Sequence, residues 1–353
     1  MQRLRAACRV PRSGRSYNAF RMTIALQRKP RMNVSVPLLL AAAGLTFGTL
    51  ATAEGYPRKP VRFIVPLAPG GGVDITTRTV GQKLTEAWGQ TVVVDNRSGA
   101  SGIIGLDLAA KAPADGYTVV VITTTHAGHP ATQSALPYDL QRDFAAITQM
   151  TSQPYILVIH PSVPASSVKE LIAVARSRPA GLTYGSSGAG GLSHLSGAQL
   201  AAIAGSNLVH VPYKGGGPAL ADLIAGQINI LFATPLESVP YIKANRIRAL
   251  AVSTAKRSKA MPDLPTLDEA GAPGFEVSGW YGVAAPAATP RDIILKINAA
   301  IVRVLRLPDI VERFARDGVE TVGTTPEEFR AHLASEIAKW KRVAASAGLL
   351  KSP

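Results

Sequence analysis

The repeated order of strand, glycine-rich loop and helix is the feature that most constrains the fold of this chain. Residues 61–65 and 182–184 are short apolar, strand-like runs, and each leads through a glycine-rich loop into a helix-like pattern. The two loops are residues 68–74 and 184–194. Alternating strands and helices are typical of an α/β protein in which helices cover both faces of a parallel sheet. Glycine lets backbone N–H groups face a ligand and a helix start adds partial positive charge, so both loops suit the binding of an anion.

The N-terminal segment predicts export. Basic residues at 28–31 precede an uncharged apolar run over 34–50, and the small residues 51–53 follow it. We interpret residues 1–53 as an N-terminal extension and a signal peptide cleaved near Ala53, which places the mature protein in the periplasm. The alternative is a transmembrane anchor, but the run is shorter than the roughly 20 residues that a membrane span needs. The start codon stays open among Met1, Met22 and Met32.

Charge and cysteine content limit the partners of the mature chain. The full sequence has a formal net charge of +15, but residues 1–53 hold nine Lys and Arg and no Asp or Glu, so their removal leaves +6. No long basic block remains, which argues against nucleic-acid binding. The single cysteine, Cys8, lies in the same segment, so we expect neither a disulfide nor a thiol-bound metal. The remaining chain of about 300 residues is long enough for two lobes.

Further periodic segments extend the pattern along the chain. We expect strands at residues 61–65, 91–94, 117–122, 155–159, 182–184, 208–211, 228–232, 247–252 and 279–284. We expect helices at residues 74–88, 101–111, 168–178, 192–204, 218–225, 238–244, 291–305, 309–316 and 326–347. The segment 123–141, rich in Thr, His and Pro, is predicted to be irregular. Asp74 is predicted to cap the helix that follows the first loop.

The order of these elements predicts two domains. The C-terminal helices must pack on a sheet. The first lobe has only about three predicted strands of its own, so it is the incomplete lobe that these helices would complete. We therefore expect a discontinuous first domain, residues 54–153 plus 279–353, and a continuous second domain, residues 154–278. The two crossing segments, near 152–155 and 278–281, would form a hinge.

Six ordered stretches carry a resemblance to a known family. They are residues 65–74 (VPLAPGGGVD), 94–100 (VDNRSGA), 111–117 (KAPADGY), 184–188 (YGSSG) with His194, 210–215 (HVPYKG), and 250–253 (LAVS) before 262–266 (PDLPT). Together they span essentially all of the mature chain. In order and spacing they resemble the substrate-binding proteins of tripartite tricarboxylate transporters, also called the Bug family.

The resemblance implies both a fold and a function. The family fold is a two-lobed periplasmic binding protein of the Venus-flytrap, type II-like class, with the ligand held between the lobes. The implied function is a non-enzymatic solute receptor that captures a small carboxylate and delivers it to a membrane permease. The expected partners are thus a small organic acid and the membrane subunits of a tripartite tricarboxylate transporter. We expect no cofactor, and we expect a monomer.

The resemblance also implies which residues hold the ligand. In the family, the ligand carboxylate is held largely by backbone amides, hydroxyls and ordered waters from loops of both lobes. The resulting candidate ligand-binding residues are Pro69, Gly70, Gly71, Gly72, Asp74, Thr124, Thr125, Ser186, Ser187, Gly188, Gly190, Gly191, Ser193, His194 and Thr234. Ser193 has the alternative role of capping the helix that leaves the second loop.

One departure from the family pattern bears on the ligand. Many members carry an acidic residue directly after the phenylalanine that matches Phe232, where this chain has Ala233 and then Thr234. A ligand with an amino group would lose a counter-charge at that point. This departure mildly favours a carboxylate without an amino group.

No catalytic residue and no metal site is predicted. Ser193 and His194 are adjacent in sequence, so they cannot form a contact between a nucleophile and its base. His126 and His129 are three residues apart, but no nearby carboxylate or thiol completes a set of metal ligands. Lys214, in a third glycine-rich turn, could either steer an anion or be an ordinary surface lysine.

Two other functions stay open from the sequence. A ligand-sensing subunit for a membrane kinase would need the same closed pair of lobes as a transport receptor. An exported enzyme that acts on carboxylates would need a paired acid and base, which the loops do not provide. The transport receptor is therefore the function that we expect.

Overall fold

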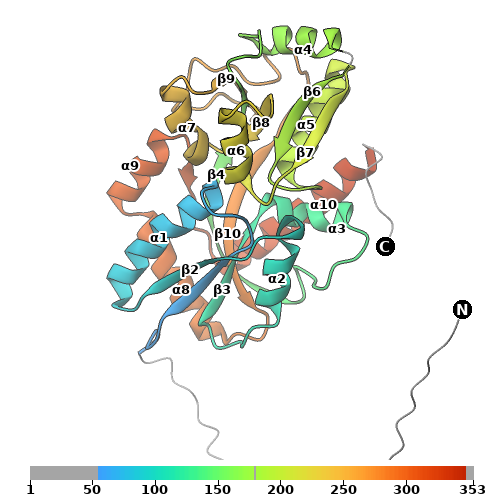
Figure 1. Ribbon diagram of the computed structural model, residues 1–353. Helices are drawn as coiled ribbons and strands as arrows, with labels where there is room; N and C mark the ends of the chain where they lie inside the picture. Colours follow the sequence, from blue (N-terminus) through green and yellow to red (C-terminus); the bar gives the residue numbers. More distant parts are fainter. Residues whose placement is uncertain (1–54, 179, 347–353) are drawn as a thin grey trace, which may run out of the picture. The chain divides into compact units, whose positions relative to one another are not determined.

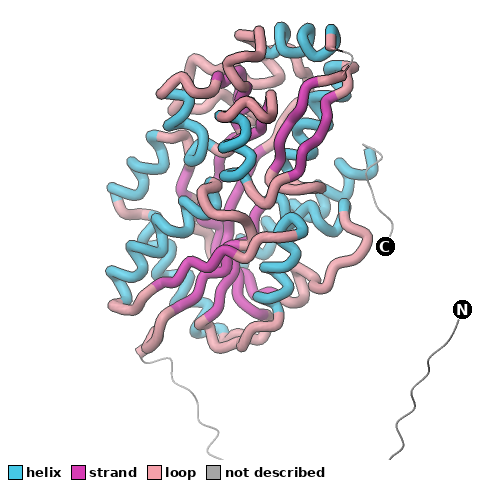
Figure 2. Tube along the Cα trace, in the orientation of Figure 1, coloured by secondary structure: helices cyan, strands magenta, loops and turns pink. Residues whose placement is uncertain are grey.

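The structure is a computed structural model that describes residues 55–178 and 180–346. The predicted signal peptide and its cleavage site at Ala53 lie outside the described residues. In the described part of the chain, no helix is both long enough and apolar enough to cross a membrane. The strands of this part group into two sheets, and helices pack around each sheet (Figures 1 and 2).

The first sheet has six strands in the order β11-β4-β10-β3-β1-β2. The strands are β1 (Val61–Val65), β2 (Val92–Asn96), β3 (Thr118–Thr123), β4 (Phe144–Pro154), β10 (Ser278–Pro286) and β11 (Glu320–Thr321). Strands β2, β1 and β3 are parallel, as the alternation of strands and helices predicted. The sheet as a whole is mixed, because the chain returns from the second sheet in β10, which runs antiparallel to both β3 and β4.

The second sheet has five strands in the order β7-β6-β8-β5-β9. The strands are β5 (Ile156–Ile159), β6 (Leu182–Ser186), β7 (Leu208–Pro212), β8 (Ile230–Ala233) and β9 (Arg248–Val252). Strands β7, β6 and β8 are parallel, and β5 runs antiparallel to both of its neighbours, β8 and β9. This sheet is also mixed, and its strand β6 ends at the second glycine-rich loop.

Helices cover both faces of the first sheet. They are α1 (Gly72–Trp88), α2 (Ile103–Ala110), α3 (Thr124–Thr132), α8 (Arg291–Leu305), α9 (Pro308–Arg316) and α10 (Pro326–Ser346), with a short 3-10 turn, η1 (Ala100–Gly102), before α2. Phe63 packs in one apolar cluster with α1, α8 and α9, whereas its neighbour Ile64 packs in another with α2, α3 and α10. Successive residues of a strand point to opposite faces, so both faces of β1 are buried.

The second sheet is covered in the same way. Its helices are α4 (Val168–Ser177), α5 (Leu192–Ala204), α6 (Gly216–Ile224) and α7 (Pro235–Lys243). Leu157 of β5 packs in the cluster that contains α4 and α5, and Val158 packs in the cluster that contains α6 and α7. The described chain is therefore an α/β protein with two helix-covered sheets.

Three elements in or around the first sheet were not predicted from the sequence: α3, β4 and the two-residue strand β11. The segment predicted as irregular, 123–141, contains α3, in which every residue except Pro130 is buried. Gly and Pro lower helix propensity, but burial against α10 overrides that preference, since tertiary packing supplies most of a helix's stability. Strand β4 was missed because its Thr, Gln and Ser residues interrupt the apolar pattern expected of a buried strand. The segment is nevertheless buried between β10 and β11.

Strands β4 and β10 are also where the chain passes between the two sheets. A single residue, Tyr155, separates the end of β4 from the start of β5. Strand β10 begins beside this point, with Ser278 paired to Pro154 and Trp280 paired to Ser152. The two crossing segments thus lie side by side in one antiparallel pair, while their action as a hinge stays a prediction.

Three helices begin earlier than the sequence predicted. Helices α1, α6 and α7 start at Gly72, Gly216 and Pro235, two or three residues before the predicted starts. Asp74 is therefore not the N-cap of α1, because Gly71 occupies that position. Each of these helices begins at the end of a loop that faces the other sheet. The helix starts therefore bring backbone N–H groups to the space between the two sheets.

Candidate functional site

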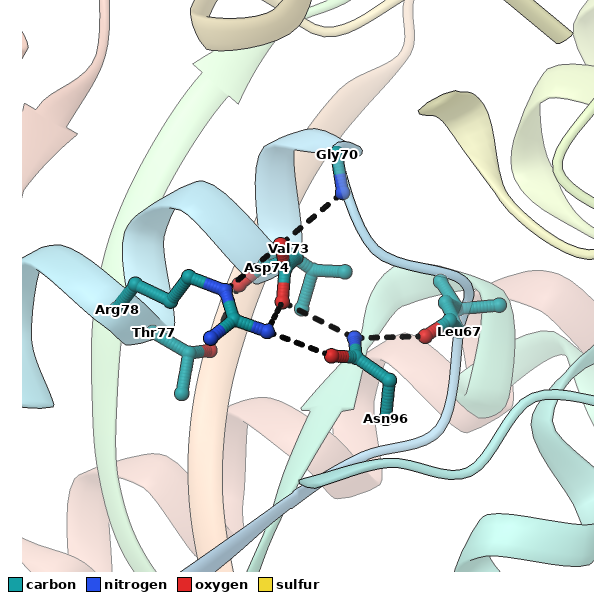
Figure 3. Close-up of polar contacts among 7 residues, drawn as sticks. All are labelled: Leu67, Gly70, Val73, Asp74, Thr77, Arg78 and Asn96. Carbon is teal, nitrogen blue, oxygen red and sulfur yellow. Dashed lines mark hydrogen bonds and ion pairs between the residues drawn. The ribbon is translucent and has the colours of Figure 1, made fainter. Parts of the chain in front are cut away.

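The first glycine-rich loop connects β1 to α1 and is organised by Asp74. The Asp74 carboxylate accepts hydrogen bonds from the backbone N–H of Gly70 and from the side-chain amide of Asn96, both at 3.0 Å. Arg78, one turn along the helix, donates to the same carboxylate from two nitrogens, each at 3.0 Å, as Figure 3 shows. Asn96 also donates to the carbonyl oxygen of Leu67, which ties the loop to β2.

This network explains the charge state of Asp74. Burial by itself would raise the pKa of the carboxyl group. Hydrogen bonds from Arg78, Gly70 and Asn96 outweigh burial, so the pKa of Asp74 lies below its usual value. Asp74 was predicted to contact the ligand, but in this structure its carboxylate is engaged by the loop itself and does not line the cavity described below. Its ligand contact stays a prediction.

Replacing this residue by Asp74→Ala should destabilise the first loop. The variant leaves Gly70 N–H and the Asn96 amide without their acceptor, so we expect a loss of about 2 kcal/mol in the free energy of unfolding. Urea denaturation followed by tryptophan fluorescence measures this loss. Asp309→Ala is the matched control, because Asp309 forms an exposed ion pair with Lys83 and should change stability little. Equal effects of the two variants would contradict the structural role of Asp74.

The second glycine-rich loop connects β6 to α5 and is held by side chains that follow it. Ser193 accepts a hydrogen bond from the backbone N–H of Ser187 at 2.9 Å, and His194 Nδ1 accepts one from Gly190 N–H at 3.0 Å. Gly188 and Gly190 have φ values of +145° and +77°, which side-chain-bearing residues rarely adopt. The N-cap of α5 is Gly191 rather than Ser193, so the capping role considered for Ser193 is wrong.

Two stacked imidazole rings, those of His194 and His210, contact the second glycine-rich loop. The ring of His194 stacks on that of His210, with centroids 3.9 Å apart. His210 Nε2 lies 2.6 Å from Ser186 Oγ, a hydrogen-bonding distance. Burial lowers the pKa of His194, and burial together with the neighbouring His194 lowers that of His210 to about 4. Neutral imidazoles therefore hold the loop, and the contact of His194 with the ligand stays a prediction.

The two loops line a common cavity between the sheets. Six of the predicted ligand-binding residues line it: Gly71, Gly72, Thr125, Ser187, Ser193 and Thr234. The other predicted residues do not line it: Pro69, Gly70, Asp74, Thr124, Ser186, Gly188, Gly190, Gly191 and His194. Water-sized spheres can occupy about 30 Å³ of this space, and a single water needs about 10–15 Å³ of such volume. The cavity thus has room for about two water molecules.

Direct contacts join the loops of the two sheets around this cavity. Ser101 donates to the carbonyl oxygen of Ala189 at 2.8 Å, and Thr125 Oγ1 accepts from the N–H of Leu192 at 3.3 Å. On the other side, the N–H of Ala68 donates to the carbonyl oxygen of Lys214 at 2.8 Å. The backbone of the third glycine-rich turn, at Lys214, therefore takes part in closing the site.

The predicted ligand-binding residues leave out ten of the sixteen residues that line the cavity, among them Tyr155, Gly216, Glu237 and Tyr281. Glu237 lies on α7, where its carboxylate accepts hydrogen bonds from the N–H of Thr234 at 2.8 Å and of Gly72 at 3.0 Å. Burial raises the pKa of Glu237, and these hydrogen bonds partly offset that effect. The spacing of Thr234 and Glu237 matches a capping box, the one sequence signal that marks this glutamate.

Glu237 bears on whether the ligand can carry an amino group. The inference against an amino group relied on the absence of an acidic residue at Ala233 and Thr234. Glu237 brings a carboxylate into the same cavity, so a counter-charge for an amino group is present after all. The argument against an amino-acid ligand therefore no longer holds.

The histidine pair of α3 is buried and forms no metal centre. In the described residues, no group of three or more His, Cys, Asp and Glu side chains is placed to hold a metal ion. His126 and His129 are fully buried, and His129 Nδ1 lies 2.8 Å from Tyr138 Oη. Burial lowers the pKa of His126 well below its ordinary value and that of His129 from 6.5 to about 4. Both rings are therefore neutral parts of the core near the site.

These buried histidines predict a loss of stability in acid. The unfolded chain binds a proton on His129 near pH 6.5, whereas the folded chain does so only near pH 4, so stability falls as pH is lowered between these values. Above pH 6.5 the contribution is fully present. We expect His129 alone to lower the free energy of unfolding by about 2 kcal/mol between pH 7.5 and 5.0.

Urea denaturation at several pH values tests this expectation. His129→Asn should weaken the pH dependence, whereas His160→Asn should preserve it, because His160 makes its contact with Ser162 near the surface. A pH dependence that is the same in the His129→Asn variant and the wild type would contradict the assignment.

Comparison with known proteins gives consistent results. The family described as "Tripartite tricarboxylate transporter family receptor" matches residues 76–349. Protein BugT of Bordetella pertussis is 33% identical over 324 residues, covering 90% of this chain and 98% of BugT. The structure of R. palustris Rpa4515 with adipate is 37% identical, has a TM-score of 0.81, and covers 84% of this chain and 99% of Rpa4515. The structure of the periplasmic binding protein BugD is 31% identical, has a TM-score of 0.80, and covers 84% of this chain and 100% of BugD.

Proposed function

The chain belongs to the tripartite tricarboxylate transporter receptor family, and from this premise we propose that its cavity holds a small organic acid. The protein is a solute receptor of the two-lobed periplasmic binding protein fold. It captures its ligand in the periplasm and delivers it to the membrane subunits of a tripartite transporter. A related structure, Rpa4515, contains adipate, which supports a carboxylate as the ligand.

One observation carries this proposal: glycine-rich loops from two separate sheets line the same cavity. Gly71 and Gly72 come from the loop after β1, and Ser187 and Ser193 come from the loop after β6 and the helix that follows. Serine hydroxyls are donors that suit a carboxylate. A ligand between them contacts both lobes at once, so it favours the closed arrangement over an open one.

Capture requires the lobes to separate and close again. The space between the loops has room for only about two water molecules and is too small for an acid such as adipate, so a ligand enters only when the loops move apart. We propose that the paired crossing segments, near 152–155 and 278–281, flex as a hinge. The first lobe then comprises 54–153 plus 279–353, and the second comprises 154–278. The division of the strands between the two sheets supports these domain boundaries.

The proposal also covers the state of the mature protein. We propose cleavage near Ala53 and a monomer without enzymatic activity. N-terminal sequencing of the protein purified from a periplasmic extract tests the cleavage site. Light scattering during size-exclusion chromatography tests the monomer.

A ligand screen tests the function. The purified mature protein is mixed with carboxylates of three to six carbons, including dicarboxylates, hydroxy acids and amino acids, and its unfolding temperature is recorded. Hits are confirmed by isothermal titration calorimetry, and mass spectrometry identifies any acid released from the denatured protein. We expect at least one carboxylate to raise the unfolding temperature and bind with one-to-one stoichiometry. Absence of binding throughout the set and of a released acid would contradict the proposed function.

A further inference from the structure

The carboxylate of Glu237 lies where three helices begin. It accepts hydrogen bonds from the first N–H of α1, at Gly72, and from the N–H of Thr234, the N-cap of its own helix α7. The third start is that of α6, because a side chain at Gly216 would place its Cβ 2.3 Å from Glu237 Oε2. Positive helix ends favour a negative charge at this point. The Gly72 N–H, which the sequence assigned to the ligand, is therefore already occupied by a side chain of the protein.

Glu237 also sets the charge of the cavity. Among the described residues that line it, Glu237 is the one acidic or basic side chain apart from the tyrosines, and the other polar side chains are hydroxyls. The titratable groups that face Glu237 are the hydroxyls of Tyr155 and Tyr281, and burial raises the pKa of both. No Lys, Arg or His of the described chain lines the cavity to balance a second negative charge.

This arrangement makes the two ends of the cavity chemically different. At the first loop, a carboxylate is already present and its oxygens accept hydrogen bonds. At the second loop, Ser187 and Ser193 lie with their hydroxyls 3.1 Å apart and can donate to an anion. A ligand carboxylate beside an ionised Glu237 would place two like charges close together in a cavity with room for few water molecules to screen them.

We propose that Glu237 determines ligand specificity by requiring a hydrogen-bond donor at the end of the ligand that faces the first loop. This inference rests on the proposed function. The ligand carboxylate binds at the second loop, near Ser187, Ser193 and Thr125. The opposite end carries a hydroxyl or ammonium group that donates to Glu237. The favoured ligand class is thus a hydroxy or amino monocarboxylate rather than a dicarboxylate.

Calorimetric titration with matched ligands tests the proposal on the mature protein. The probes are adipate, 6-hydroxyhexanoate and 6-aminohexanoate, together with succinate, 4-hydroxybutanoate and 4-aminobutanoate. In the wild type, we expect at least one hydroxy or amino acid to bind at least tenfold more tightly than the dicarboxylate of the same length. Glu237→Gln keeps an acceptor at the capping position but removes the charge, so it should shift that ratio at least tenfold towards the dicarboxylate.

Glu336→Gln is the matched control. Glu336 is another buried glutamate, which accepts hydrogen bonds from Trp280 and Trp340 and does not line the cavity. This variant should retain the wild-type ratio even where its stability falls. A merely structural role of Glu237 would weaken all the probes together and leave the ratio unchanged.

The possible results distinguish a failure of the proposed Glu237 role from a failure of the proposed receptor function. If carboxylates bind but Glu237→Gln leaves the ratio unchanged, or the wild type prefers the dicarboxylates, the role of Glu237 is refuted and the receptor function stands. If none of the six probes binds and the carboxylates that do bind carry neither a hydroxyl nor an ammonium group, the inferred ligand class is refuted. If no carboxylate of the screen binds the wild type and none is released from it, the proposed function fails and the inference fails with it.

Discussion

Gly72→Ala is expected to lower the affinity for the carboxylate ligand about 30-fold. A Cβ at this position would lie 2.2 Å from Thr234 Oγ1 and 3.0 Å from Thr234 Cβ, which belong to the opposing side of the cavity. A contact this short forces the two sides apart, and overpacking of this kind costs about 2 kcal/mol, which corresponds to roughly a 30-fold loss of affinity. Gly72 does not have a positive φ, so alanine is compatible with the backbone and the variant should fold.

Isothermal titration calorimetry with the ligand identified by the screen measures this loss. Gly128→Ala is the control, because it adds the same methyl group to a helical glycine whose nearest neighbouring atom would be 3.7 Å away. The control should bind as the wild type does. Wild-type affinity in the Gly72→Ala variant would show that close approach at this point is not needed for binding.

Phe329→Ala is expected to have the largest effect on stability, a loss of about 3–5 kcal/mol in the free energy of unfolding. The Phe329 ring lies on α10, is fully buried, and packs over Gly282 of β10, where a Cβ would come within 2.1 Å of the ring. It also meets Trp280 edge to face, with centroids 5.7 Å apart. Removing the ring leaves a cavity where the C-terminal helix covers the first sheet.

Urea denaturation of the mature protein tests this expectation. Leu295→Ala is the control, because Leu295 on α8 is 43% exposed and its truncation should cost well under 1 kcal/mol. A loss from Phe329→Ala as small as that of the control would show that the packing of α10 on β10 contributes little. It would also weaken the assignment of 279–353 to the first lobe.

Most helices and strands could be predicted because their sequence patterns are strongly periodic. Helix α5, at Leu192–Ala204, and helix α8, at Arg291–Leu305, have the predicted bounds. The elements that were missed include α3 and β4, which have weak local preferences and owe their form to burial. Prediction thus failed where tertiary packing, rather than local propensity, selects the structure.

The candidate site shows the same division. The sequence by itself determined the two glycine-rich loops and the helices that follow them, because turns and helix starts depend on residues a few positions apart. Only the tertiary structure decided that Glu237 meets Gly72 across 165 positions of the chain, filling the amide site that the glycines alone would leave to a ligand. Hydrogen bonding and burial act between neighbours in space, so the charge and size of the cavity follow from packing of the two sheets.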